Sequence, residues 1–301
     1  MSFEQNTTDK TYDFSTGSEL ISLCKSEGLT IAEVMIRREI RRSDLSRDIV
    51  ISQMREYLDI MRKAADVGIN EKQSSVTGFT GGDALRMQRY AKRSYIGEDM
   101  SNAVAAALGV VEVNSSMGRI VAAPTAGSAG ILPACLITAG EKFSLNDDQL
   151  INGLFTASAV GMIIAEHATL AGSEGGCQAE VGSASAMAAA SLCELRGALP
   201  SVSLTAAAIA IKMILGLVCD PVAGLVECPC IKRNAMGTVN AMLSADMALS
   251  GIVSLIPFDE VVTAMRNVGR QMNVDLRETA KGGLAATPTG KELLRRMRQQ
   301  D

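Results

Sequence analysis

The chain has 301 residues, with 29 Lys and Arg, 33 Asp and Glu, and a formal net charge of −4. This length allows one large domain with a sizeable core, and the acidic balance argues against a nucleic-acid-binding surface. Seven cysteines at irregular spacing do not fit a small disulfide-bonded scaffold. The polar N-terminus predicts no signal peptide, so we expect a cytoplasmic protein with reduced thiols.

The first part of the chain is predicted to form a helical cap over residues 18–100. Residues 1–17, which precede it, are polar and are expected to be flexible. Apolar residues at helical spacing predict amphipathic helices, the first of them capped by Ser18, over residues 18–28, 30–45 and 46–67. A loop rich in Gly, Ser and Thr follows over residues 68–84.

The middle of the chain, residues 101–256, is predicted to be the buried core. Ala, Leu and Met dominate it without the alternation typical of strands, and helices that are apolar on most faces are usually buried. The expected core helices cover residues 101–112, 129–139, 147–170, 182–197, 203–217 and 235–255. The tail, residues 257–301, returns to amphipathic helix. We therefore expect one all-α domain over residues 18–301, with an Ala- and Met-rich helical core and the functional site on its loops.

A polar, glycine-rich segment, "NSSMGRIVAAPTAGSAG", interrupts the core helices at residues 114–130. Free backbone amides at a helix start, together with the hydroxyls of Ser115, Ser116 and Thr125, suit a carboxylate or a phosphate. An ordinary capped turn between helices is the more common explanation of such a segment. The motif alone does not decide between the two.

The cysteines form a second group of signals. Cys177 follows two glycines at the expected start of a helix, where a thiol has a lowered pKa and binds metal well; a small buried cysteine is the usual alternative. Cys219, Cys228 and Cys230 share one loop, for which a disulfide, a redox switch and a metal site compete. Their spacing does not match a zinc ribbon. Three thiols from two distant loops can, however, meet at one four-iron cluster and leave its fourth iron open.

Three segments together resemble the alpha chain of the two-chain, iron–sulfur-dependent L-serine dehydratases: "SSMGRIVAAPTAGSAGILPA", "GSEGGCQAEVGSASAMAAA" and "CDPVAGLVECPCIKRNA". The resemblance implies that Cys177, Cys219 and Cys230 hold a [4Fe-4S] cluster. Cys228 departs from the family pattern, in which an apolar residue is usual, and this leaves open that Cys228 replaces Cys230 as the ligand. Cys230 is favoured because it alone matches the motif. The remaining cysteines fall on helical patterns and are expected in the core: Cys24, Cys135 and Cys193.

The implied reaction converts L-serine to pyruvate and ammonia, with the open iron as a Lewis acid for the substrate hydroxyl. Residues of the 114–130 segment are expected to shape the pocket for the substrate carboxylate: Ser115, Ser116, Met117, Gly118, Thr125, Ala126 and Gly127. His167, the sole histidine, and Glu180 are the candidates for the base that removes the α-proton. Lys232 and Arg233 are expected either to steer a carboxylate or to cap a helix.

The resemblance also implies a partner, because in the two-chain enzymes a separate beta chain completes the molecule. We expect L-serine and a beta chain as partners, and neither nucleic acid nor a membrane; the sequence is compatible with a homo-oligomer. A membrane span is not expected because the most apolar stretch, residues 204–219, is short and carries Lys212. Two alternatives stay open, a redox sensor that oxidises at Cys228 and Cys230, and a helical scaffold with structural zinc at this loop.

Overall fold

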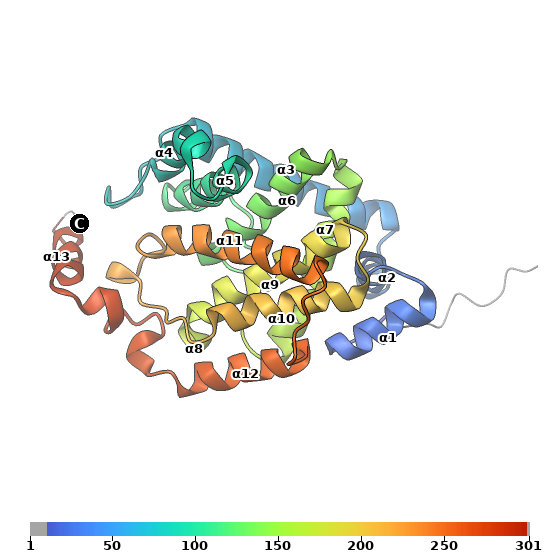
Figure 1. The fold of residues 1–301 in the computed structure, drawn as a ribbon. Coiled ribbons are helices and arrows are strands. Elements are labelled where there is room, and N and C mark those ends of the chain that lie inside the picture. Colours follow the sequence, from blue (N-terminus) through green and yellow to red (C-terminus); the bar gives the residue numbers. More distant parts are fainter. Residues whose placement is uncertain (1–10, 300–301) are drawn as a thin grey trace, which may run out of the picture.

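The computed structural model describes residues 11–299, and this part of the chain contains helices and no β-strand (Figure 1). The predicted all-α class is therefore confirmed. The α-helices are, in chain order, α1 (Gly17–Glu27), α2 (Ile31–Ser43), α3 (Arg47–Asn70), α4 (Asp83–Tyr90), α5 (Glu98–Ser115), α6 (Ile131–Phe143), α7 (Asp147–His167), α8 (Gly172–Gly175), α9 (Cys177–Leu195), α10 (Pro200–Ile214), α11 (Cys230–Leu249), α12 (Phe258–Gln271) and α13 (Pro288–Met297). Short 3-10 helices lie between them: η1 (Ala91–Arg93), η2 (Ala126–Ser128), η3 (Val222–Gly224), η4 (Val274–Leu276) and η5 (Gly283–Ala286).

Helix α9 lies at the centre of the molecule, with α10 and α11 in front of it (Figure 1). Of its 19 residues, 16 are buried, and most of these are Ala, Ser or Gly. It packs against α6, α7, α10 and α11. Small side chains allow neighbouring helix axes to lie close together, and a helix that is apolar on all sides is stable only when it is surrounded. The start of α9 is therefore held firmly by its neighbours.

The N-terminal helices pack directly on the core helices, α2 against α7 and α3 against α5. The predicted boundaries of cap, core and tail stay a prediction. The predicted flexible segment falls mainly on residues 1–10, which lie outside the described residues. Residues 11–16 are not helical, and Phe14 is buried in the hydrophobic core. Tyr12 accepts a hydrogen bond of 2.8 Å from Arg37 Nη1 on α2.

The prediction that Ser18 caps the first helix is wrong. The N-cap is Thr16, whose side chain accepts from the N–H of Glu19, while the Glu19 carboxylate accepts from the Thr16 N–H. This reciprocal capping box satisfies two backbone donors at once. The Ser18 hydroxyl instead donates to Asp259 at 2.8 Å, and so ties α1 to α12.

Helix α9 begins at Cys177, as the two glycines before it indicated, although the predicted helix range began only at residue 182. Helix α11 begins at Cys230, earlier than the predicted residue 235, and α4 was not predicted. Polar residues near the two helix starts made these stretches resemble loops, but their side chains have buried partners. Gln178 donates to the carbonyl of Met265 at 3.0 Å and accepts from the N–H of Gly216 at 2.9 Å. Buried polar groups with such partners are compatible with a helix.

Helix α7 is the one helix of residues 11–299 that is long and apolar enough to cross a membrane by length and composition. Of its apolar window, 67% is buried inside this molecule, where α7 packs against α2 and α9. Core helices of proteins that do not span a membrane pass the same test. Length and composition are therefore weak evidence for a membrane span here.

Helices α3 and α5 cross where Gly68 faces Gly109. A Cβ on Gly68 would lie 2.3 Å from the Cα of Gly109, which is backbone and cannot rotate away. We expect Gly68→Ala to force the helices apart and to lower the free energy of unfolding by about 1–3 kcal/mol, the usual cost of overpacking. Gly182→Ala is the matched control, since its Cβ would meet Met265 Sδ at an ordinary 3.9 Å. Denaturant unfolding measures both variants, and equal stability would contradict the close helix contact.

Candidate metal centre

Two buried thiols and one carboxylate converge at the start of α9. The Sγ atoms of Cys177 and Cys219 and a carboxylate oxygen of Glu180 all lie within 4.8 Å of one another. Glu180 Oε2 is 3.9 Å from each sulfur. Cys177 and Glu180 share one face of α9 because they lie about one turn apart. Thiolates and a carboxylate form a donor set that can hold a metal ion.

The charges around Cys177 favour its thiolate form. A hydrogen bond with the Cys219 thiol and the positive charge of Arg233 hold the pKa of Cys177 below its ordinary value. The same contact with Cys177, together with burial, raises the pKa of Cys219. Burial raises the pKa of the Glu180 carboxyl, and the negative charge of Glu278 raises it further. The surroundings thus favour the thiolate form of Cys177 and the protonated form of Cys219.

Arg233 and Asp220 form a buried ion pair that connects the two cysteine loops. Arg233 Nη2 lies 2.6 Å from Asp220 Oδ1, and Asp220 is 3% exposed. Arg233 Nη1 donates to the carbonyl of Val218 at 2.9 Å and to Cys177 Sγ at 3.3 Å. Lys232 and Arg233 were expected to steer a carboxylate or to cap a helix. Of the two side chains, only Arg233 lies at the thiols. Lys232 instead pairs with Asp83 on α4.

Cys230, the third predicted ligand, is the first residue of α11 and is buried. It lies outside the close group of Cys177, Glu180 and Cys219. Burial raises the pKa of Cys230, and the negative charges of Cys177 and Glu180 raise it further, so the three groups share one electrostatic environment. Its role as a ligand stays a prediction.

The structure divides the predicted substrate pocket into two places. Thr125 donates to Glu180 Oε1 at 2.9 Å, and a Cβ on Gly127 would lie 3.3 Å from the same oxygen. Ala126 lies between them in η2. Asn234 on α11 holds this segment in place, since it donates to the carbonyl of Gly127 at 2.7 Å. The 125–127 segment therefore lies beside the thiols.

The other predicted residues, 115–118, lie at the end of α5, whose last residue is Ser115. The hydroxyls of Ser115 and Ser116 donate to the carbonyl of Glu112, at 3.0 and 2.8 Å. Met117, which precedes Gly118, has a φ of 64° and is 82% exposed. Together with Glu227, Ser115 and Met117 line a hollow of about 600 Å³. The substrate-binding role of these residues stays a prediction.

The two candidate bases lie in different surroundings. Glu180 lies between the two thiols. His167 ends α7, and its Nε2 lies 2.9 Å from the carbonyl oxygen of Ser15, near the start of the described chain. The catalytic role of both residues stays a prediction. Of the two, only Glu180 lies beside the thiols.

Sequence reasoning missed the C-terminal segment 274–284, which returns to Cys219. The Cys219 N–H donates to the carbonyl of Leu276 at 2.8 Å, and the Glu278 N–H donates to the carbonyl of Cys219 at 2.7 Å. Further along, the Leu284 N–H donates to Asp220 Oδ2 at 2.7 Å. The paired glycines at 282–283 were the available signal, because such pairs mark a close approach of backbone.

The remaining cysteines lie away from this group. All seven cysteines are free thiols, so no disulfide joins Cys219, Cys228 and Cys230 in this structure. Cys24, Cys135 and Cys193 are buried in the hydrophobic core, as predicted, and burial raises the pKa of Cys24 and of Cys193 to about 12. Cys228 is half-buried.

A substitution at Gly283 can test whether the C-terminal segment keeps Cys219 in position. Gly283 has a φ of +57°, and a Cβ there would lie 2.3 Å from Asp220 Oδ2. We expect Gly283→Ala to displace Asp220 and so to loosen the C-terminal segment beside Cys219. Cys219 in the metal-free protein should then react about tenfold faster with a thiol reagent, which corresponds to a free energy of local opening that is lower by ~1.4 kcal/mol. Gly224→Ala is the control, since its φ of +75° is also left-handed but nothing lies within 4 Å. Mass spectrometry identifies the modified cysteine, and equal rates in both variants would contradict this role.

Known proteins resemble the chain over most of its length. Residues 26–285 match the family described as serine dehydratase alpha chain. The chain is 50% identical over 282 residues to the probable L-serine dehydratase, alpha chain, of Bacillus subtilis, which covers 93% of this chain and 94% of that protein. It is 45% identical to the L-serine dehydratase, alpha chain, of Peptoniphilus asaccharolyticus, over 93% of this chain and 97% of that protein.

A longer relative is L-serine dehydratase 2 of Escherichia coli, which is 37% identical over 91% of this chain but only 62% of its own length. The matches therefore cover nearly the whole of the relatives named alpha chain, and only part of the longer protein. The family match includes each of the segments that carry Cys177, Cys219 and Cys230. The chain belongs to the serine dehydratase alpha chain family.

Proposed function

We propose that this chain is the alpha chain of an L-serine dehydratase, a lyase that converts L-serine to pyruvate and ammonia. The observation that carries the proposal is the convergence of Cys177, Cys219 and Glu180 in a member of this family. The names of the Bacillus and Peptoniphilus relatives support the substrate. Family membership also favours this function over the alternative of a redox sensor.

We further propose that Cys177, Cys219 and Cys230 hold a [4Fe-4S] cluster. Soft thiolate donors suit iron–sulfur clusters, and the positive charge of Arg233 and the first turns of α9 and α11 offset part of their negative charge. The residues fit such a group, since two thiols already converge and the third begins the helix that carries Arg233. When bound, a four-iron cluster with three protein thiolates supplies an open iron that acts as a Lewis acid.

The chain's own residues supply the remaining chemistry of the proposed reaction. Dehydration removes the α-proton and hydroxide from L-serine, and the aminoacrylate that forms tautomerises to an imine, which water hydrolyses to pyruvate and ammonia. Glu180 is our proposed base for the α-proton. In support, it lies beside both thiols, and Thr125 donates to its carboxylate at 2.9 Å. Arg233 keeps Cys177 in position.

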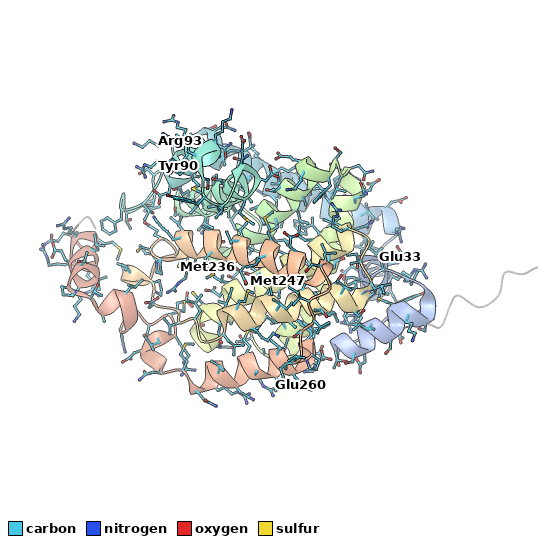
Figure 2. The ribbon with its side chains drawn as sticks, in the orientation of Figure 1. Glu33, Tyr90, Arg93, Met236, Met247 and Glu260 are labelled. Atoms are coloured by element: carbon cyan, nitrogen blue, oxygen red, sulfur yellow. The ribbon has the colours of Figure 1, made fainter. Side chains whose placement is uncertain are left out.

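A separate beta chain completes the proposed enzyme. In support, this chain covers 94% and 97% of two relatives named alpha chain, but 60–64% of relatives named L-serine dehydratase without a chain designation. Exposed apolar side chains also lie on α11, on which Figure 2 labels Met236, and on the loop that follows. The most exposed are Leu243, Leu249, Ile252, Val253, Leu255 and Ile256. Apolar surface of this kind is typical of a subunit contact.

We also propose that the protein is cytoplasmic, because free thiols and an iron–sulfur cluster fit a reducing compartment.

The cluster assignment predicts about four irons per chain after anaerobic reconstitution. Cys177→Ala, Cys219→Ala and Cys230→Ala should each lose most of this iron and the broad visible absorption, because each removes one thiolate. Cys24→Ala and Cys193→Ala are the controls, since both thiols are buried in the core. Iron and sulfide analysis measures the result. Full iron retention in Cys219→Ala would exclude it as a ligand.

The partner assignment predicts that the isolated chain folds and holds a cluster, yet forms little pyruvate. Adding the beta chain should restore activity, since a second chain would complete the active site. The measurement is pyruvate formation from L-serine under anaerobic conditions, first with the reconstituted chain alone and then with its partner. Full activity of the isolated chain would refute the need for a second chain.

A further inference from the structure

Arg277 is a cationic side chain at the metal centre that lacks an ionic partner. Within residues 11–299, no carboxylate lies at ion-pair distance from its guanidinium, and its Nε is buried without a hydrogen-bond acceptor. The contact that its side chain does make is long, 3.4 Å from Nη1 to the carbonyl oxygen of Glu174. A buried polar group without a partner costs about 1–3 kcal/mol, so its presence calls for an explanation.

The position of Arg277 connects it to both close thiols. Its backbone pairs with Cys219 in an isolated bridge, closed by hydrogen bonds on either side. Its side chain reaches the backbone carbonyl of Glu174 in α8, the short helix that precedes Cys177. The residue is half-buried, so a small anion can reach the guanidinium from solvent. Arg277 therefore lies at the rim of the Cys177–Cys219 pair.

The backbone that follows Arg277 is strained. Glu278 has a φ of 62° and Ala280 a φ of 56°, the left-handed region that non-glycine residues rarely adopt. Each such residue costs about 1–2 kcal/mol, and such strain persists where the surroundings hold it and clusters at ligand-binding sites. Here the carbonyl of Cys219 holds Glu278, and Asp220 holds Leu284. The strained segment thus fixes Arg277 against the metal centre.

The charges at the centre show why a free cation is needed there. Glu180 and Glu278 carry negative charge beside the thiols, and on their own they would repel the carboxylate of an amino acid. Arg233 cannot offset this repulsion, because Asp220 and Cys177 already occupy its guanidinium. Arg277 has no such partner, and a guanidinium matches a carboxylate with two parallel hydrogen bonds.

We propose that Arg277 binds the α-carboxylate of L-serine, an inference that rests on the proposed dehydratase function. The cation then recognises the part of the substrate that takes no part in bond breaking, and leaves the hydroxyl and the α-proton facing the thiols and Glu180. It selects for substrates that carry a free carboxylate beside the amino group.

The test uses the reconstituted enzyme with its beta chain under anaerobic conditions. Arg277→Ala should raise the KM for L-serine about 10- to 100-fold, the effect of losing a charge-assisted hydrogen bond, with a smaller change in kcat. Arg277→Lys should raise KM less than Arg277→Ala does, because lysine keeps the positive charge but lacks the two parallel N–H donors of the guanidinium. Lys281→Ala is the matched control, an exposed cation of the same segment, and should leave KM unchanged.

Two competitors of L-serine separate carboxylate binding from other effects. 3-Hydroxypropanoate keeps the carboxylate and hydroxyl, and its inhibition constant should rise in Arg277→Ala by a factor similar to that for KM. 2-Aminoethanol keeps the amine and hydroxyl, and its inhibition constant should not change. Iron content should equal that of the wild type in both Arg277 variants.

The results that would overturn the proposal differ from those that would overturn the dehydratase function. An unchanged KM in Arg277→Ala, an equal rise in Lys281→Ala, or loss of iron in both Arg277 variants would each refute the binding role of Arg277 alone. Absence of pyruvate from the wild-type enzyme with its beta chain would refute the dehydratase function itself, and the binding role with it.

Discussion

The buried ion pair between Arg233 and Asp220 is the interaction on which the rest of the site depends. Arg233 also bonds Cys177 and the carbonyl of Val218, and Asp220 also accepts from Leu284. One pair of side chains thus joins the start of α9, the loop after α10, the first turn of α11 and the C-terminal segment. Desolvating two charges is costly, and the cost is offset only when their geometry and hydrogen bonds are complete. The pair is therefore stable only when all four segments are in place.

Helix packing brings the thiols to this pair. The small side chains of α9 allow α11 to lie close against it, and each helix begins with a cysteine. The first turn of a helix carries unpaired N–H groups and a partial positive charge, which favours a thiolate. The proposed cluster would thus be held at the ends of two rigid core helices, with the third thiol on a loop that the C-terminal segment secures.

The two arginines of the centre differ in what surrounds them. Arg233 is enclosed, and its guanidinium bonds only groups of the chain itself. Arg277 lies at the rim, with a buried Nε that has no acceptor among the described residues 11–299. An enclosed cation organises a site, whereas a cation without a partner can meet an anion from outside. This contrast gives the centre an internal scaffold and a polar rim suited to a small zwitterion.

The sequence by itself determined the all-α class and the burial of the middle of the chain, and it singled out Cys177 and Cys219, which the structure brings together. Helical periodicity and small-residue composition are local properties, and the motifs around Cys177 and Cys219 are contiguous stretches of chain. The predicted ranges of the helices that became α9 and α11 began too late, because Gln178 and Arg233 look like loop residues until their buried partners are known.

Only the tertiary structure decided which residues meet at the centre. Asn234 holds Thr125–Gly127 beside Glu180, while the end of α5 carries Ser115–Gly118 to the hollow beside Glu227. The return of Arg277 to Cys219 rests on backbone hydrogen bonds between segments far apart in the chain. Backbone N–H and C=O groups are the same in nearly every residue, so such a contact leaves little trace in the amino-acid sequence.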